Sequence, residues 1–93
     1  VVGRSLIVGR PLATMLIQKN CTVTIVHSKT KDPMYECKAS EIIIAAAGVP
    51  NLITKEWVKK DACLIDVGIN KVNGKIIGDA NFKDVCKIAS YIT

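Results

Sequence analysis

The sequence has few aromatic residues, one histidine and no long apolar run. Its 93 residues include one Trp, two Tyr, one Phe and one His. No stretch approaches the roughly eighteen apolar residues of a membrane-spanning helix, and the N-terminus lacks the charged, apolar and small-residue zones of a signal peptide. We therefore expect an intracellular, cytoplasmic protein with no membrane partner, while a mitochondrial location stays open.

Clustered basic residues are also missing, although the chain is basic. It carries 13 Lys and Arg residues against 8 Asp and Glu residues, a formal net charge of +5. The basic residues are spread along the chain with no stripe of stacking aromatics among them, which argues against a nucleic-acid partner. An anionic small ligand or an acidic partner surface explains the charge at least as well.

The four cysteines lack the spacing of a metal site. Cys21, Cys37, Cys63 and Cys86 form no C-x-x-C pair, and His27 stands apart from all of them in sequence. No metal site is therefore expected. In an intracellular protein, such thiols are expected to be reduced and structural.

What the chain does contain is the composition of a folded α/β domain. It is 49% hydrophobic and 23% charged, which argues against disorder. Apolar, β-branched runs predict strands at residues 1–2, 22–26, 42–47, 63–67 and 91–92. Amphipathic stretches predict helices at residues 11–19, at residues 54–59 with Thr54 as the cap, and after Asn81, with Phe82, Val85, Ile88 and Ala89 on one face. Asn73-Gly74 predicts a tight turn, and Trp57 is interpreted as a packing residue.

This alternation predicts an α/β fold of the Rossmann-like, doubly wound type, with a mostly parallel sheet and helices on both faces. Residues 1–93 are expected to be one domain. The first strand has only two residues before Gly3, whereas an ordinary strand has about five or six, and the last strand has hardly begun. We therefore expect the domain to be truncated at both ends.

The first predicted loop, from Gly3 to Pro11, has features of a phosphate cradle. Gly3 allows a close approach of the backbone to a ligand, and Arg4 supplies charge. Ser5 and free N–H groups at the start of the helix are expected to donate to phosphate oxygens. The match to G-x-G-x-x-G is poor, because Ser5 and Val8 replace the second and third glycines. On pattern alone, a plain strand-to-helix turn explains the loop about equally well.

The end of the second predicted strand lacks a carboxylate. Dinucleotide folds usually carry an Asp or Glu there for the adenosine ribose, whereas this chain has His27-Ser28-Lys29-Thr30-Lys31. Hydroxyls and cations would tolerate a 2′-phosphate, so NADP is the predicted cofactor. The alternative is a solvated polar turn. His27 is interpreted as a strand-end residue rather than an acid or base, and Asp66 as a strand-end or backbone-binding carboxylate.

Six short motifs together resemble the successive motifs of methylenetetrahydrofolate dehydrogenase/cyclohydrolases, in the family's order and over the whole chain. They are Gly-Arg-Ser-x-x-Val-Gly-x-Pro from Gly3, His-Ser-Lys-Thr from His27, Ala-Ala-Gly-x-Pro from Ala46, Asp-Val-Gly-Ile-Asn from Asp66, Gly-Asp at Gly78, and Tyr-Ile-Thr from Tyr91.

The resemblance implies an NAD(P)-binding Rossmann-type domain and assigns cofactor contacts to it. The phosphates and the adenosine end would be held by Gly3, Arg4, Ser5 and Ser28, with Gly48 and Ile69 beside the nicotinamide. A catalytic lysine would come from a preceding folate-binding domain, and a Pro- and Gly-rich loop after Thr93 would complete the folate site. No catalytic residue is assigned within residues 1–93.

The resemblance further implies NADP-dependent oxidation of 5,10-methylenetetrahydrofolate to the methenyl form, with cyclohydrolase activity giving 10-formyltetrahydrofolate. It implies a homodimer and a place in one-carbon metabolism and purine biosynthesis, while the isolated segment is expected to be inactive. Two alternatives remain open. One is another two-domain NADP dehydrogenase, similar to shikimate dehydrogenase, and the other is a non-catalytic nucleotide-binding module.

Overall fold

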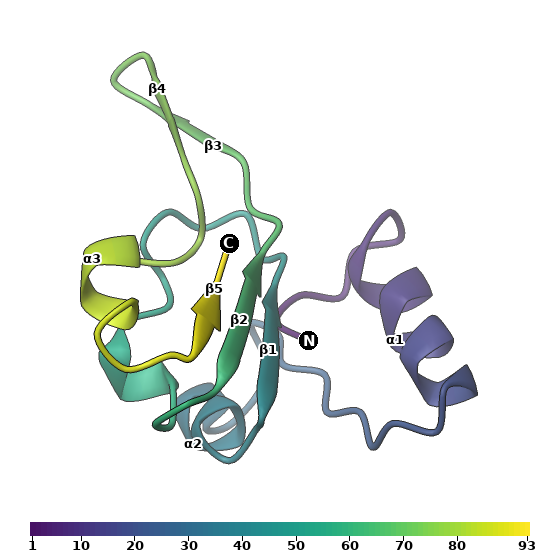
Figure 1. The fold of residues 1–93 in the computed structure, drawn as a ribbon. Helices are drawn as coiled ribbons and strands as arrows, with labels where there is room; N and C mark the ends of the chain where they lie inside the picture. The colour runs from purple at the N-terminus through teal and green to yellow at the C-terminus, as the bar shows by residue number, and fades with distance from the viewer.

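The computed structural model describes all 93 residues (Figure 1). Its helices are α1 (Gly9–Gln18), α2 (Pro33–Lys38) and α3 (Phe82–Val85), with one 3-10 turn, η1 (Lys55–Trp57). Its strands are β1 (Ile42–Ala45), β2 (Cys63–Asp66), β3 (Asn70–Val72), β4 (Lys75–Ile77) and β5 (Tyr91–Ile92). No helix is long and apolar enough to cross a membrane.

The main sheet is parallel. β1, β2 and β5 lie in that order, and β1 pairs with β2 from Ile42 opposite Cys63 to Ala45 opposite Asp66. Val2 extends the same alignment through parallel bridges to both Ala45 and Val26. Counted along the chain, the five extended segments therefore lie in the order 2-1-3-4-5, which is one of the two common orders of doubly wound folds. The predicted Rossmann-like, mostly parallel sheet is confirmed, and Figure 1 shows α1 and α3 on opposite sides of the strands.

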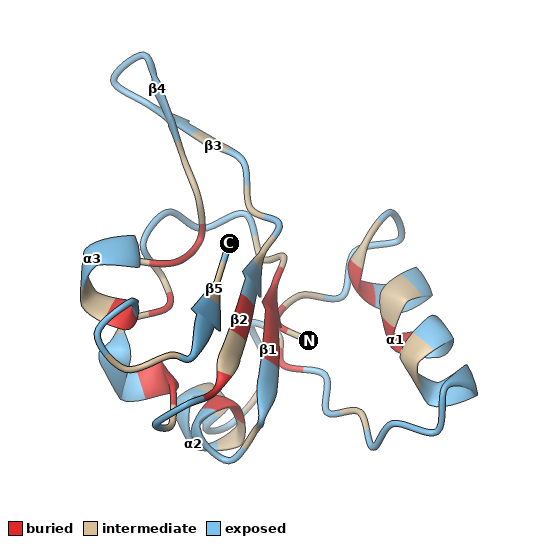
Figure 2. Cartoon of the chain, viewed as in Figure 1, coloured by how far each residue is buried: buried red, intermediate tan, exposed pale blue.

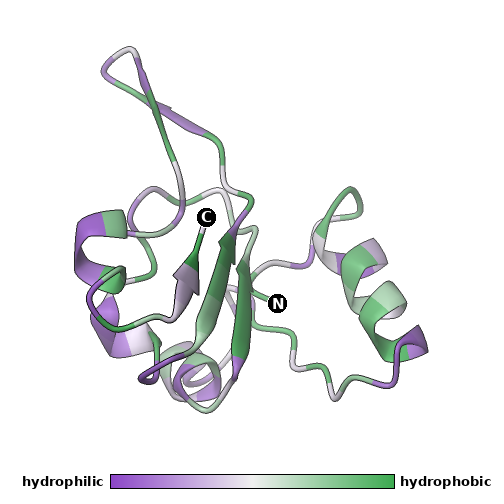
Figure 3. Ribbon diagram, viewed as in Figure 1, coloured by the Kyte–Doolittle hydropathy of each residue, from purple (hydrophilic) through white to green (hydrophobic).

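The core lies along β1 and β2, because these strands are covered by other elements and are made of apolar residues. Ile43, Ala45 and Leu64 are almost fully buried. Figure 3 shows that both strands are largely hydrophobic, and Figure 2 shows that each has a buried part and an exposed part. Trp57 is 9% exposed and belongs to the same cluster, which confirms its interpretation as a packing residue. The side of the core away from α1 is therefore well packed.

The predicted strand at residues 22–26 is largely wrong as a regular element. Only Val26 forms a bridge, to Val2, although the N-terminal amine of Val1 also donates to the carbonyl of Thr24 at 2.9 Å. The β-branched sequence does favour extended backbone, but within residues 1–93 the pairing is confined to the single bridge between Val26 and Val2.

The polar stretch at residues 28–40 contains a helix that the periodicity did not predict. The side chain of Asp32 accepts a hydrogen bond from the N–H of Tyr35 at 3.2 Å, and Pro33 occupies the first helical position of α2. An Asp-Pro pair is a helix-start signal, but the helix that follows is short and has no apolar stripe.

Two further helix predictions need correction. The helix expected at residues 54–59 is the single turn η1, and the Thr54 hydroxyl donates to the Glu56 carboxylate at 2.8 Å instead of capping the helix. Asn81 caps α3 as predicted, through the N–H of Asp84 at 3.4 Å, but α3 ends at Val85. Phe82 is 54% exposed and does not join the buried face.

The predicted turn at Asn73-Gly74 is confirmed. Both residues have positive φ angles, 51° and 78°, and they connect the antiparallel strands β3 and β4. These two strands were not predicted, and they form a hairpin that projects away from the main sheet (Figure 1).

Candidate functional site

A cavity of about 460 Å³ opens where the parallel strands end. Its lining comes from the segments that follow Val2, Val26 and β1. Val2 lies between Val26 and β1, so the next segment of the chain pairs on one side of Val2 and the one after it pairs on the other side. Such a reversal of strand order is the topological switch point where doubly wound folds bind ligands. The lining residues are Val2, Gly3, Arg4, Ser5, Val26, His27, Ser28, Thr30, Pro33, Ala46, Ala47, Val49, Leu52 and Trp57. None of them is an Asp or Glu.

Gly3 is required at the start of the first loop for two reasons. Its φ angle is +121°, and a Cβ atom there would lie 2.9 Å from the carbonyl carbon of Ala46. A side chain would therefore collide with backbone that follows β1, and only glycine allows the two segments to approach so closely.

Ser5 closes the start of α1 internally. Its Oγ accepts hydrogen bonds from the N–H groups of Val8 at 3.1 Å and Gly9 at 3.3 Å, and its carbonyl accepts from the N–H of Arg10 at 2.9 Å. Pro11 has no N–H. The expectation that free N–H groups at the helix start would donate to phosphate is therefore wrong, because the chain itself uses them.

The free donors lie one turn earlier, in the loop. The backbone N–H groups of residues 4–7 donate to no protein atom. Four consecutive backbone donors therefore remain available to a ligand, and Arg4 and Ser5 also line the cavity. That this loop holds a phosphate stays a prediction, now with loop amides as the candidate donors in place of helix amides.

Gly9 is a functional residue that the sequence pattern missed. A Cβ atom there would lie 2.8 Å from the carbonyl carbon of Gly3 and 2.9 Å from the Cα of Arg4. Gly9 therefore allows α1 to pack directly on the loop, which is the task of the third glycine in G-x-G-x-x-G. The pattern placed that glycine at Val8, and one extra loop residue moves it to the next position.

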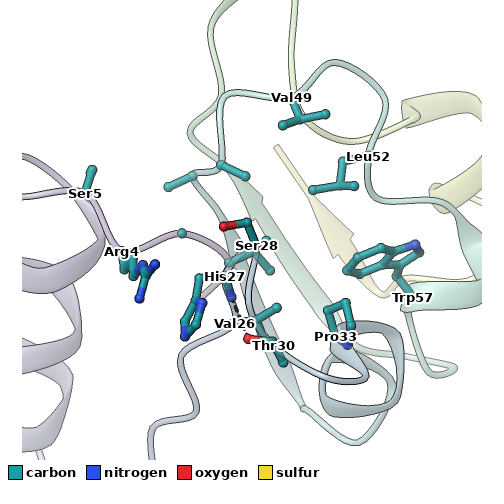
Figure 4. A pocket seen from close by; sticks show the side chains of 14 residues that line it. Arg4, Ser5, Val26, His27, Ser28, Thr30, Pro33, Val49, Leu52 and Trp57 are labelled. Carbon is teal, nitrogen blue, oxygen red and sulfur yellow. Dashed lines mark hydrogen bonds between the residues drawn. The ribbon is translucent and has the colours of Figure 1, made fainter.

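The turn after Val26 is closed by its own side chains. The N–H of His27 donates to Thr30 Oγ1 at 2.9 Å, and the N–H of Lys29 donates to His27 Nδ1 at 3.1 Å. His27 thus supports the turn, and Ser28 is left exposed with neither its N–H nor its hydroxyl bonded to protein. Figure 4 shows Arg4 and Ser5 on one side of the opening, Pro33, Leu52 and Trp57 on the other, and His27 and Ser28 between them.

The loop after β1 borders the same cavity, and a buried carboxylate holds it. Ala47 and Val49 line the cavity, and a Cβ atom on the intervening Gly48 would meet nothing within 4 Å. The three N–H groups of these residues all donate to Asp79, which is fully buried. Ile69 is 78% exposed and is not part of the lining.

Asp66 has the backbone-binding role expected of it. Its carboxylate accepts hydrogen bonds from the N–H groups of Gly68, Asp79 and Ala80 at 2.9–3.0 Å. With both oxygens occupied, it connects the end of β2 to the segment that carries Asp79. The structure therefore brings Gly3, Arg4, Ser5 and Ser28 to one cavity. Gly48 and Ile69 are not among its lining residues, although both chain neighbours of Gly48 are.

Comparison with known proteins gives one consistent family. Residues 1–93 match the family described as tetrahydrofolate dehydrogenase/cyclohydrolase, NAD(P)-binding domain. The chain is 53% identical over all of its length to the bifunctional protein FolD of Pelagibacter ubique and 50% identical to that of Caldanaerobacter subterraneus, covering 33% of each. The chain thus spans about a third of the length of the curated relatives it matches.

Solved structures agree. The bifunctional FolD of Campylobacter jejuni superimposes with a TM-score of 0.96 at 47% identity, over 99% of this chain and 33% of that one. The Trypanosoma brucei enzyme, solved with NADP cofactor and inhibitor, superimposes with a TM-score of 0.89 at 42% identity, over 99% of this chain and 34% of that one. Together with the match over every residue, these findings show that the chain belongs to the NAD(P)-binding domain family of the tetrahydrofolate dehydrogenase/cyclohydrolases.

Proposed function

We propose that this domain binds NADP within a longer enzyme that oxidises 5,10-methylenetetrahydrofolate to 5,10-methenyltetrahydrofolate and hydrolyses that product to 10-formyltetrahydrofolate. The supporting observation is the loop of four unpaired backbone N–H groups at residues 4–7, at the edge of a cavity without a carboxylate. The family match supplies the reaction class, and the Trypanosoma brucei relative was solved with NADP.

The residues of the cavity fit a dinucleotide diphosphate. The unpaired backbone amides of residues 4–7 would bind the negatively charged pyrophosphate. Arg4 and Ser28 would bind the 2′-phosphate of the adenosine, because both reach the cavity and neither is paired with a carboxylate. Ser5 would add its hydroxyl proton to the cradle.

Gly48 and Ile69 would lie beside the nicotinamide. When bound, NADP would accept a hydride from the methylene carbon of the folate. The contribution of residues 1–93 is then to orient the cofactor, and correct orientation lowers a barrier by as much as roughly 7–11 kcal/mol in favourable cases. No acid, base or nucleophile of residues 1–93 is assigned to the reaction.

An assay of the full-length protein tests this proposal. Purified protein should form NADPH from NADP and 5,10-methylenetetrahydrofolate, and should convert the methenyl product to 10-formyltetrahydrofolate. NADP binding without turnover would instead support the non-catalytic module. Turnover of shikimate would support the other two-domain dehydrogenase, although the family match favours the folate enzyme.

A homodimer, a cytoplasmic location and a role in purine biosynthesis belong to the same proposal. The family match supports them only indirectly, through the bifunctional relatives. Sedimentation analysis of the full-length protein would measure its oligomeric state, and a monomer at the concentration of the assay would contradict the homodimer.

A further inference from the structure

One buried side chain holds the loop that follows β1. Asp79 Oδ2 accepts hydrogen bonds from the N–H groups of Ala47 at 2.7 Å and Gly48 at 3.0 Å, and Oδ1 accepts from the N–H of Val49 at 3.1 Å. Three successive peptide N–H groups therefore point at one carboxylate. Their directions fix how residues 47–49 face the cavity.

The same carboxylate also holds a second loop. Asn70 Nδ2 donates to Asp79 Oδ1 at 2.8 Å, and Asn70 directly follows Ile69. Gly48 and Ile69, the two positions expected beside the nicotinamide, thus belong to loops that converge on one side chain. Because both oxygens of Asp79 are occupied by these four donors, the side chain offers nothing to a ligand directly.

Asp79 is itself held in place. Its N–H donates to Asp66 Oδ1 at 3.0 Å, and its carbonyl accepts from the N–H of Ile53 at 2.9 Å. A Cβ atom on Gly68 would lie 2.7 Å from the nitrogen of Asp79, so the neighbouring loop packs directly against it. Asp79 is therefore fixed by its own backbone contacts, and it holds the two loops at residues 47–49 and at Asn70 through its side chain.

Resting on the proposed function, we propose that Asp79 is a positioning residue for the nicotinamide end of the cofactor. It acts through Gly48 and Ile69, by setting the distance and orientation of their two loops. The adenosine end depends on the loops at residues 3–5 and 27–30, none of which bonds to Asp79. A change at Asp79 should therefore affect the two ends of the cofactor unequally.

The informative variant is Asp79→Asn in the full-length protein. It keeps the size of the side chain but replaces one oxygen with an NH₂ group, which would face N–H donors. NADP affinity and kcat should each fall about tenfold, the usual effect of losing hydrogen bonds to a charged group. The probe for the adenosine end is 2′,5′-ADP, which lacks the nicotinamide, and its affinity should change by less than about twofold.

A matched control is Asp84→Asn. Asp84 also accepts a backbone hydrogen bond, from the N–H of Lys55 at 2.9 Å, but neither residue lines the cavity. This variant should leave NADP affinity, 2′,5′-ADP affinity and kcat near their wild-type values. A second variant, Asn70→Ala, removes one donor while keeping Asp79, and should lower kcat about threefold.

The outcomes separate cleanly. Equal losses of NADP and 2′,5′-ADP affinity in Asp79→Asn would show a general structural role and overturn the inference, as would an unchanged kcat. If Asp79→Asn does not fold, Asn70→Ala decides, and an unchanged kcat there overturns the inference. If the wild-type protein binds neither ligand, the proposed function is wrong and the inference falls with it.

Discussion

Arg4 and Ser28 reach the same cavity from two different loops. Neither has a carboxylate partner, and the hydroxyl and N–H of Ser28 are free of protein contacts. A charged guanidinium and a neutral hydroxyl at one opening favour a ligand with an extra phosphate over one with a free ribose hydroxyl. The proposed preference for NADP can therefore be tested with single substitutions.

The full-length enzyme should prefer NADP to NAD, and Arg4→Ala should weaken NADP about tenfold or more while NAD hardly changes. Ser28→Asp should narrow or reverse the preference, because a carboxylate repels the 2′-phosphate and accepts from the ribose hydroxyl. Titration of each variant with both cofactors measures this. Lys19→Ala, which removes a cation outside the cavity, is the control, and equal weakening of both cofactors by Arg4→Ala would assign Arg4 to the shared pyrophosphate.

Cys37 differs from the other cysteines in its surroundings. It is 3% exposed, and burial, reinforced by the negative charge of Glu36, raises its pKa to about 11, although the N-terminal amine acts in the opposite direction. Cys21 and Cys86 are exposed, and all four thiols are free. Since the thiolate is the reactive form, Cys37 should be less reactive than Cys21 and Cys86 at neutral pH.

At about pH 8, iodoacetamide should modify Cys21 and Cys86 well before Cys37 in the folded protein. The pKa of Cys37 is raised in the folded state, so this thiol stabilises the fold below the ordinary thiol pKa of about 8.5. That contribution should be lost as the pH rises towards about 11, where the folded thiol ionises. Peptide mass mapping after timed labelling gives the modification rates of Cys21, Cys37 and Cys86. Equally fast labelling of Cys37 would show that its burial does not persist in solution.

At the scale of elements, the sequence predicted those that carry a strong local signal. The apolar runs gave β1 and β2 almost to the residue, Asn73-Gly74 gave its turn, and Asn81 gave its cap. Failures occurred where tertiary context decides. Residues 22–26 have the composition of a strand, yet only Val26 forms a bridge, and pairing depends on a distant segment that no local pattern reports.

The site shows the same division. Residues of the first loop, at 3–5, and of the second loop, at 27–30, line one cavity as predicted. They do so because the loops that follow parallel strands lie at the same edge of the sheet. The roles of Gly9 and Asp79 were not predicted, since each depends on a contact with a distant segment or on a one-residue shift in loop length. The contacts that reveal these two roles are visible in the structure, and they correspond to no fixed spacing of residues in the sequence.

The start of α2 offers a test of capping in this fold. Asp32→Ala removes the acceptor for the N–H of Tyr35, and should lower the free energy of unfolding by about 1 kcal/mol. Thr54→Ala is the matched comparison, because the Thr54 side chain makes no capping hydrogen bond to η1, and its effect should be smaller. Urea unfolding of the full-length variants measures both, and a larger loss for Thr54→Ala would contradict the assignment of the caps.

At the scale of the whole molecule, residues 1–93 belong to an NAD(P)-binding domain family, and no catalytic residue is assigned to them. The cavity is lined by Arg4, hydroxyls and apolar side chains, with His27 engaged in supporting its turn. Purified residues 1–93 should therefore show neither dehydrogenase nor cyclohydrolase activity, while the full-length protein shows both. Coupled assays under identical conditions compare them, and measurable turnover by the short chain would require a catalytic residue within it.

Val2 pairs with its neighbours only through isolated bridges, and this affects the cooperativity of unfolding. Two hydrogen bonds join residues 1–30 to residues 31–93, namely from the N–H of Val2 to the carbonyl of Ile44 and from the N–H of Ala46 to the carbonyl of Val2, both at 2.8 Å. The cavity is lined by both parts of the chain, with Arg4 and Ser28 from residues 1–30 and Ala47 and Leu52 from residues 31–93. A dinucleotide bound there would contact both parts of the chain and would add to the two hydrogen bonds that join them. Native-state hydrogen exchange should show the amides of α1 opening more readily than those of β1, and saturating NADP should slow α1 exchange most, by mass action on the closed form. Equal slowing of exchange in α1 and β1 by NADP would mean that the two parts open as one unit, and unchanged protection of α1 would mean that NADP does not stabilise its closed form.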